Sequence, residues 1–156
     1  AHDIEQQVGC GGQLELAAEV SLPVSIHARD CTRDMLELLE TNGALLRRGF
    51  VMHCFSGSRE TAERLIKLGA YISFAGPLTF KNSKNLPEVA AAVPEDRLLT
   101  ETDSPYLTPH PFRGRTNTPA YVKYVAEKLA EIRGADVVSL ASAVRRNARR
   151  LFDRMV

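Results

Sequence analysis

The sequence has almost no net charge and no long apolar run. Its 20 Lys and Arg residues oppose 19 Asp and Glu residues, for a formal net charge of +1. The overall electrostatic field of the protein therefore does not favour binding to nucleic acid or to a membrane. Any anionic partner must be bound by a local group of residues. The apolar runs are well short of the roughly 18 residues that suggest a membrane span, so we expect no membrane partner. The opening segment, AHDIEQQVGC, lacks the basic and apolar parts of a signal peptide, so we expect a cytoplasmic location.

Cysteines are few and do not form a recognisable framework. Cys10, Cys31 and Cys54 are odd in number and show no CxxC spacing. This pattern favours reduced thiols over a disulfide scaffold or a cysteine-rich zinc site. With 44% hydrophobic and 25% charged residues in 156 positions, the composition is that of one ordinary globular domain.

Apolar patterning predicts strands and helices in alternation. Buried strands are expected near residues 23–27, 50–54, 70–75 and 97–101. Helices are expected over residues 13–20, 32–42, 58–69, 86–93, 118–134 and 137–155. Strands joined by helices pair in parallel through right-handed crossovers, so the sequence predicts a parallel α/β sheet without a second domain.

Three of the expected strands lead into a residue that can bind a metal ion: His27, His53 and Asp103. Reactive groups gather at the carboxyl ends of parallel strands, because the following loops can shape a pocket there. A single histidine at such a place is more often structural, but three such residues at one end of a sheet favour a metal site. Imidazole and carboxylate donors suit Zn²⁺, Mn²⁺ or Fe²⁺ better than Ca²⁺.

A set of motifs carries a family resemblance. VSIHARD, VMHCFSG, YISFAGPLTF, LLTETDSPYL and PFRGRTNTP occur in this order, and together they resemble the second half of the TatD family of metal-dependent deoxyribonucleases, among the amidohydrolase-like hydrolases. The resemblance implies a parallel β/α (TIM-type) barrel, of which this chain supplies strands five to eight. It also implies that His27 and His53 bind one or two divalent ions (Mg²⁺, Mn²⁺ or Zn²⁺), and that Asp103 binds metal and handles the proton of the attacking water.

The chain departs from the family pattern in its first part. The HxH pair of the first strand and the bridging Glu of a GEIGLDY-like segment have no counterpart in the sequence. A β/α barrel usually needs about 250 residues, so we expect the 156 residues to form a single partial domain. The glycine-rich segment at residues 9–12 is a possible junction or site of a missing segment. Without the first-half ligands, a dinuclear site cannot form from this chain alone.

Other polar residues near the expected site have two interpretations each. Glu101 lies on the same face as Asp103 by strand alternation, and acts either in catalysis at the metal or as a hydrogen-bond acceptor beside it. Arg113 and Arg115 flank Gly114, and present guanidinium forks that suit a phosphate group unless they are solvated loop arginines. We favour Arg113 as the substrate contact.

Further candidates lie in the other loops. Arg29, directly after His27, contacts substrate or forms an ion pair at the pocket mouth. Ser56 starts a turn whose amide groups suit an anion. Asn117 is expected to cap the helix that follows it. The basic cluster at residues 145–150 is expected to be the solvated face of an amphipathic helix rather than a nucleic-acid surface.

The sequence thus predicts hydrolysis of DNA phosphodiester bonds by water that a divalent metal activates. Two alternatives remain open: hydrolysis of an amide or lactone by the same apparatus, and a catalytically incomplete half-barrel. No obligate protein partner is expected, but open sheet edges would permit self-association.

Overall fold

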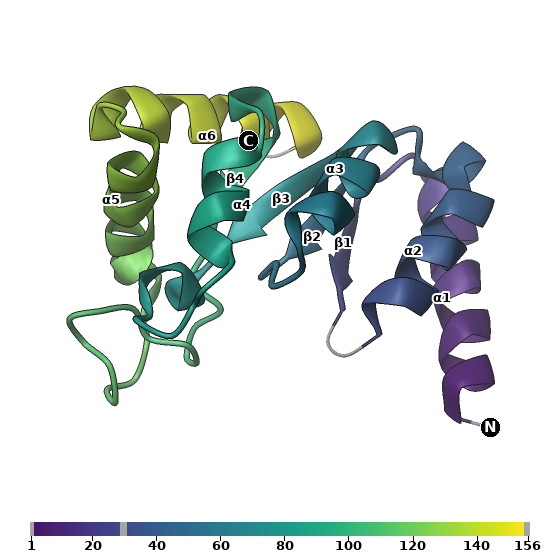
Figure 1. The fold of residues 1–156 in the computed structure, drawn as a ribbon. Coiled ribbons are helices and arrows are strands. Elements are labelled where there is room, and N and C mark those ends of the chain that lie inside the picture. The colour runs from purple at the N-terminus through teal and green to yellow at the C-terminus, as the bar shows by residue number, and fades with distance from the viewer. Residues whose placement is uncertain (1, 29–30, 155–156) are drawn as a thin grey trace.

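The computed structural model describes residues 2–28 and 31–154, and its centre is a parallel sheet of four strands in the order β1-β2-β3-β4 (Figure 1). The strands are β1 (Val24–His27), β2 (Phe50–His53), β3 (Ala70–Phe74) and β4 (Leu98–Thr100). All neighbouring pairs are parallel. The predicted parallel α/β sheet is confirmed, and each strand lies within its predicted range.

Six α-helices and four short 3₁₀-helices connect and flank the strands in the described residues. The α-helices are α1 (His2–Glu19), α2 (Thr32–Thr41), α3 (Arg59–Lys67), α4 (Leu86–Ala92), α5 (Val122–Arg133) and α6 (Val137–Leu151). The 3₁₀-helices are η1 (Gly43–Leu46), η2 (Gly76–Thr79), η3 (Glu95–Arg97) and η4 (Pro119–Tyr121). None of the helices in this part of the chain is long and apolar enough to span a membrane.

The helix ends follow local chemistry. Ser58 caps α3 by accepting a hydrogen bond from the Thr61 backbone N–H at 3.2 Å. Gly134 ends α5 in the left-handed conformation (φ 60°), which glycine adopts without a Cβ penalty. The first helix is longer than predicted, since α1 continues through residues 9–12. A junction or missing segment there stays a prediction.

The main core lies between the sheet and the helices on one face. Strand alternation directs Phe50, Met52, Ile72 and Leu98 to this side, where they pack with the helix residues Leu39, Leu65, Val89, Val125 and Leu129. Phe50 is fully buried, and burial of such a side chain contributes about 1.5–3 kcal/mol. The face of the sheet that meets these helices is therefore the aliphatic one.

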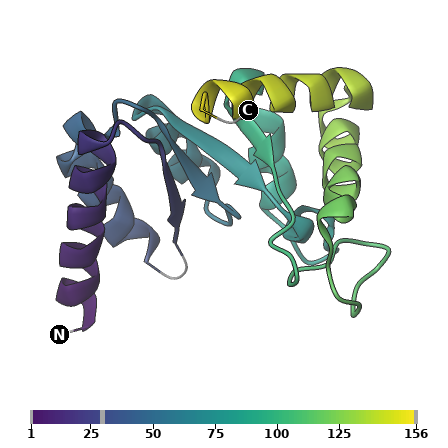
Figure 2. The ribbon, with the colours of Figure 1, turned by 180° about the vertical axis from the view of Figure 1, so that it is seen from behind.

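The opposite face of the sheet changes character along the strands. At the amino end, Val51, Tyr71 and Leu99 form a second buried cluster with Leu151 of α6. Two residues closer to the carboxyl end of each chain segment, the same face carries His53, Ser73 and Glu101. Figure 2 shows α6 passing along the end of the sheet opposite the strand tips. One end of this face is thus sealed by apolar side chains, and the other is polar.

Helix α6 presents the amphipathic pattern that the sequence predicts. Leu140, Val144 and Leu151 are buried, whereas the arginines of the basic cluster are exposed: Arg145, Arg146, Arg149 and Arg150. The interpretation as a solvated face is confirmed as far as exposure is concerned.

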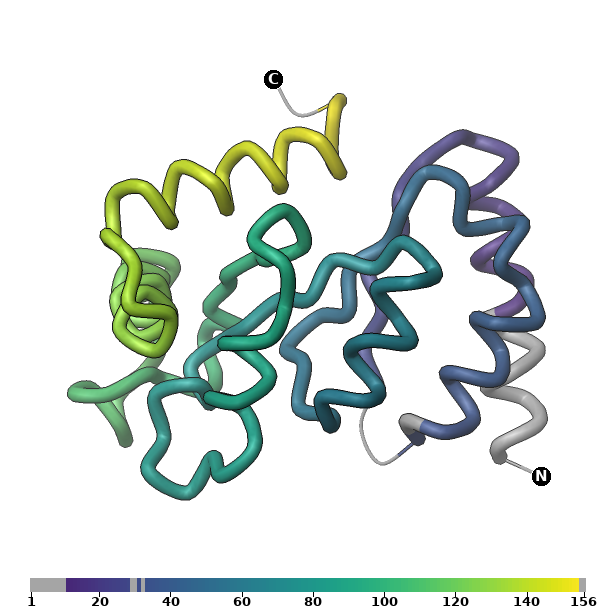
Figure 3. Tube along the Cα trace, turned by 45° about the horizontal axis from the view of Figure 1, so that its top comes forward, coloured from purple at the N-terminus to yellow at the C-terminus, as the bar shows by residue number. Residues whose placement is uncertain are grey.

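The sheet does not close in the described residues. In the strand order, β1 and β4 each have a neighbour on one side. Figure 3 shows the α1–α2 pair and the α5–α6 pair at opposite ends of the arrangement. Apolar side chains are exposed at both ends, Leu16, Val20 and Leu22 near β1 and Val137 and Val138 on α6.

Candidate metal centre

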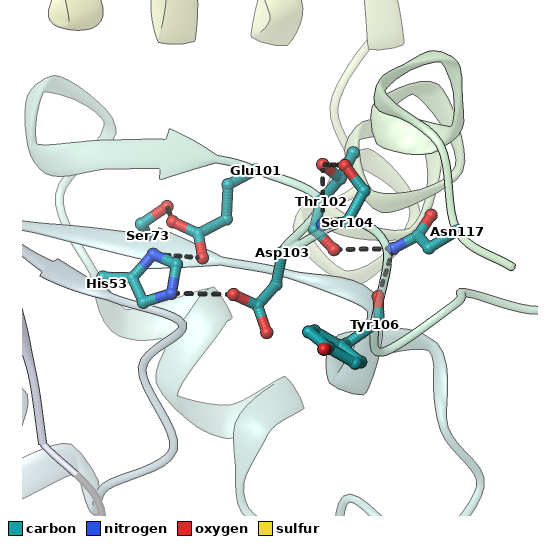
Figure 4. Close-up of polar contacts among 8 residues, drawn as sticks. All are labelled: His53, Ser73, Glu101, Thr102, Asp103, Ser104, Tyr106 and Asn117. Carbon is teal, nitrogen blue, oxygen red and sulfur yellow. Dashed lines mark hydrogen bonds and ion pairs between the residues drawn. The ribbon is translucent and has the colours of Figure 1, made fainter.

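Three potential metal ligands meet at the carboxyl edge of the sheet. His53 is the last residue of β2, and Glu101 and Asp103 follow the end of β4. One ligand atom from each of these residues lies within 4.8 Å of the others. Figure 4 shows all three side chains pointing toward one another. The parallel arrangement of the strands is the cause, since it brings their carboxyl ends to the same edge.

The His53 ring lies between the two carboxylates. Its Nδ1 is 2.8 Å from Oε1 of Glu101, and its Nε2 is 3.0 Å from Oδ1 of Asp103. The three side chains are only partly exposed, at 27%, 20% and 26% for His53, Glu101 and Asp103. A ligating histidine commonly has a carboxylate on its second nitrogen, because this fixes the tautomer and the orientation of the ring.

Ser73 of β3 fixes Glu101. The Ser73 side chain is buried and its hydroxyl donates to Oε2 of Glu101 at 2.6 Å. The Glu101 backbone N–H donates to the Phe74 carbonyl at 3.0 Å. One carboxylate oxygen is therefore committed to the protein, while the other faces the centre of the cluster.

The donor set fits a divalent cation. Oε1 of Glu101 is buried and, among the described residues, accepts no hydrogen bond, although His53 Nδ1 is within ion-pair distance. Two neighbouring carboxylates repel each other unless a positive charge is shared between them. One imidazole and two carboxylates are ligands that Zn²⁺, Mn²⁺ and Fe²⁺ accept.

His27 lies beside the cluster. Its strand register pairs it with His53, and the centroids of the two rings are 5.4 Å apart with planes at 46°. The ring is exposed, and His27 is outside the group of ligand atoms that lie within 4.8 Å of one another. Of the predicted ligands, the structure brings His53 and Asp103 together and adds Glu101; ligation by His27 stays a prediction.

The backbone of Asp103 explains how its carboxylate reaches His53. Asp103 lies beyond the end of β4 and has φ 56°, in the left-handed region. Aspartate tolerates this conformation better than most residues, at a cost of about 1 kcal/mol or more. The Tyr106 backbone N–H donates to the Asp103 carbonyl at 2.9 Å and closes a turn. This turn, rather than strand alternation, aims the side chain.

Asn117 has a role that the sequence interpretation missed. Its side chain is 3% exposed and donates from Nδ2 to the carbonyls of Thr102 (2.7 Å) and Tyr106 (2.6 Å). The predicted capping role is wrong: Thr118 is the N-cap of η4 and Tyr121 that of α5. The sequence offers no signal for this role, because the hydrogen-bond partners of a loop asparagine are set by the tertiary fold. From the sequence alone, such an asparagine cannot be distinguished from a capping or turn residue.

The predicted substrate contacts lie in the loops around this edge. The Arg113 guanidinium stacks 3.6 Å from the centroid of the Phe80 ring, and Arg115 lies 5.7 Å from that of Phe112. Both arginines are exposed. Ser56 is exposed and, with His53, lines a small cavity of about 20 Å³. Arg29 lies outside the described residues.

Comparison with known proteins finds relatives described as DNases and metal-dependent hydrolases. A family model described as TatD related DNase matches residues 4–153. The chain is 51% identical over 150 residues to a protein of Bacillus subtilis (strain 168) named uncharacterized metal-dependent hydrolase YabD, with 96% of this chain and 58% of that protein covered. It is 44% identical over 149 residues to the uncharacterized metal-dependent hydrolase YcfH of Escherichia coli (strain K12), with 96% and 56% covered.

A solved structure shows the same fold. The crystal structure of YJJV, a TatD homolog from Escherichia coli K12, superposes with a TM-score of 0.85 at 34% sequence identity, and the match covers 92% of this chain and 54% of that one. The chain thus spans somewhat more than half the length of the relatives it matches. The match of the family model along almost the whole chain establishes that it belongs to the family of TatD-related DNases.

Proposed function

We propose that the protein hydrolyses phosphodiester bonds of DNA at the His53–Glu101–Asp103 cluster. The observation that carries the proposal is the convergence of one imidazole and two carboxylates, whose ligand atoms lie within 4.8 Å of one another at the carboxyl edge of the sheet. Such a donor set suits a divalent ion, and the family description supports DNA as the substrate.

The residues of the cluster have separate tasks. A bound divalent ion would polarise the phosphate and lower the pKa of a water molecule. Asp103 contacts His53 through Oδ1, while its other oxygen points away from the ring in Figure 4. In the proposed reaction this second oxygen would accept the proton of the attacking water. Glu101 holds the His53 ring through Nδ1, and Ser73 holds Glu101.

The loop arginines supply a site for the phosphate of the substrate. Stacking on Phe80 occupies the face of the Arg113 guanidinium and leaves its edge, where the N–H donors lie, for hydrogen bonds. A guanidinium edge matches two phosphate oxygens. This chemistry favours a phosphodiester over an amide or lactone, which have no anion for Arg113 to bind.

We infer that this chain corresponds to strands five to eight of a β/α barrel, with the remaining ligands, the HxH pair and the bridging Glu, on the rest of the barrel. Two features support this. The chain matches 58% of YabD, and an apolar groove of about 390 Å³ opens beside β4, lined by residues of α5 and α6 that include Val137 and Val144. By itself the chain would be catalytically incomplete, and its sheet edges would favour self-association.

The test uses a complete protein that contains this chain, a single-stranded and a double-stranded DNA oligonucleotide, and Mn²⁺. Asp103→Asn should abolish most turnover without loss of fold, because the amide is nearly isosteric but cannot accept the proton. Asp153→Asn is the matched control, since Asp153 pairs with Arg48 at 2.7 Å, away from the cluster.

Two results would contradict the proposal. One is an Asp103→Asn variant that cleaves DNA at the rate of the control. The other is a wild-type protein that hydrolyses a lactone or amide but neither DNA substrate. Measurable cleavage by the 156-residue chain alone would show that the inferred remainder of the barrel is dispensable.

A further inference from the structure

Asn117 is a buried polar side chain whose hydrogen-bonding capacity is well used. Nδ2 donates to the Thr102 and Tyr106 carbonyls at 2.7 and 2.6 Å, and Oδ1 accepts from the Thr118 backbone N–H at 2.9 Å. An asparagine amide has two N–H donors and one carbonyl acceptor. Both N–H donors therefore bind the backbone of the segment from Thr102 to Tyr106.

The two carbonyls bracket Asp103. Thr102 comes directly before it, and Tyr106 closes the turn by donating its backbone N–H to the Asp103 carbonyl at 2.9 Å. A third bond joins the same segments, from the Asn117 backbone N–H to the Pro105 carbonyl at 3.1 Å. Figure 4 shows Asn117 reaching across the turn from the side opposite His53.

Asp103 needs such a restraint. Its φ of 56° is disfavoured for residues with a Cβ, and such a conformation persists only where the surroundings hold it. The sheet cannot hold it, since β4 ends at Thr100. Yet the Asp103 carboxylate must stay 3.0 Å from His53 Nε2 for the cluster to exist.

We propose that Asn117 is a positioning residue, which fixes Asp103 in the left-handed turn that presents its carboxylate to His53 and to a divalent cation. The part of this inference that concerns the cation rests on the proposed function of the cluster. Among the described residues, the Asn117 side chain bonds to the backbone of Thr102, Tyr106 and Thr118 and not to the side chains of the cluster. It therefore acts on Asp103 through the backbone of Thr102 and Tyr106.

The chain offers a matched control at the other end of the same strand. Asn147 of α6 is also 3% exposed, and its Nδ2 donates to the carbonyls of Glu95 (2.7 Å) and Leu98 (3.0 Å). These bonds fasten the amino end of β4. Loss of Asn147 therefore removes the same kind of contact from the same strand without touching the turn that carries Asp103.

The experiment compares Asn117→Ala and Asn147→Ala in a complete protein that contains this chain, by calorimetric titration with Mn²⁺ at a temperature where circular dichroism shows both variants folded. Both should lose thermal stability, because each leaves two backbone carbonyls without their donor. Only Asn117→Ala should weaken Mn²⁺ binding, by about 10–100-fold, as expected when a group that orients a ligand is removed. Equal losses of Mn²⁺ affinity in the two variants, or none in Asn117→Ala, would overturn the proposal.

A second measurement separates this proposal from that of the metal site. In a metal-free crystal structure of Asn117→Ala, Asp103 should leave the left-handed region and its contact with His53 Nε2 should be broken. If the wild type binds no Mn²⁺, the proposed function of the cluster fails, and this structure alone decides the positioning role: an unmoved Asp103 refutes it. If Asn117→Ala does not fold, Asn117→Asp and Asn147→Asp take the places of the alanine pair, since aspartate keeps the size and the acceptor but lacks both donors.

Discussion

Gly76 provides a sharp test of how the loop after β4 sets the site. A Cβ built on Gly76, the first residue of η2, would lie 1.7 Å from the Leu107 carbonyl oxygen, 2.9 Å from its carbon and 3.3 Å from the Pro109 nitrogen. Ordinary contacts of this kind begin at 3.4 Å, so in Gly76→Ala the backbone near Leu107 must retreat by about 1.7 Å, the difference between the two distances. All three atoms belong to the backbone, and a rotamer change cannot relieve the overlap.

This retreat should disturb function more than stability. Leu107 belongs to the same loop as Asp103, and misplacement of a reacting group by about 1 Å costs on the order of 100-fold in rate, equivalent to about 2.7 kcal/mol of activation free energy. Overpacking typically destabilises by about 1–3 kcal/mol, or roughly 2–12 °C in Tm for a domain of this size. We therefore expect a folded Gly76→Ala variant with kcat/KM on DNA reduced at least about 100-fold in the complete protein.

The assay pairs DNA cleavage with thermal unfolding followed by circular dichroism. Gly43→Ala is the control, because a Cβ at Gly43 meets no atom within 4 Å. It should leave both quantities near the wild-type values. A Gly76→Ala variant with wild-type kcat/KM would refute the claim that the position of the Leu107 backbone is coupled to Asp103.

Three further predictions address the core, the surface electrostatics and the substrate. Phe50→Ala should lower the free energy of unfolding by about 3–5 kcal/mol in urea titrations, since Phe50 is fully buried under the helices; a loss below about 1 kcal/mol would contradict its place in the core. The backbone N–H of Ser139 donates to Asp136 and lowers the pKa of that carboxyl below its usual value. The stability that this bond contributes is therefore present above the unfolded-state pKa and is lost as the pH falls through the lower folded-state pKa. In Asp136→Asn, the midpoint of thermal unfolding should fall less steeply as the pH is lowered. A pH dependence equal to that of the wild type would count against the role of Asp136 as the N-cap of α6. Arg113→Ala should weaken DNA binding most at low salt and reduce the slope of log K against log salt by about 1; an unchanged slope would show that Arg113 does not meet a phosphate.

The sheet and most helices were predictable because local patterns specify them. The run from Phe50 to Met52 is apolar and follows Gly49, and Ser58 signals the start of α3 as an N-cap. Right-handed crossovers then leave a parallel sheet as the consistent topology. The convergence of His53 and Asp103 follows from the same reasoning, because the carboxyl ends of parallel strands share an edge.

What remained unpredictable depends on contacts between distant segments. Strand alternation correctly placed Glu101 on the same face of the sheet as His53. The Ser73 hydroxyl that fixes Glu101, however, comes from β3, the strand that pairs with β4. Strand alternation was expected to continue to Asp103, whereas β4 ends at Thr100 and a left-handed turn aims the carboxylate. Periodicity cannot report such a turn, nor the bonds from Asn117 that hold it.

The apolar cluster beneath the site limits the directions from which other molecules can approach His53 and Glu101. Val51, Tyr71, Leu99 and Leu151 fill the space on the amino-terminal side of His53 and Glu101. Water and ions cannot pass through this packed layer, and its low polarity strengthens the attraction between the carboxylates and any cation above it. If the cluster acts as proposed, substrate and products would reach it from the loop side, where Tyr106 and Arg113 lie, rather than through this layer. Changes in those loops would alter which molecules reach the cluster, while the sheet and its apolar floor stay the same.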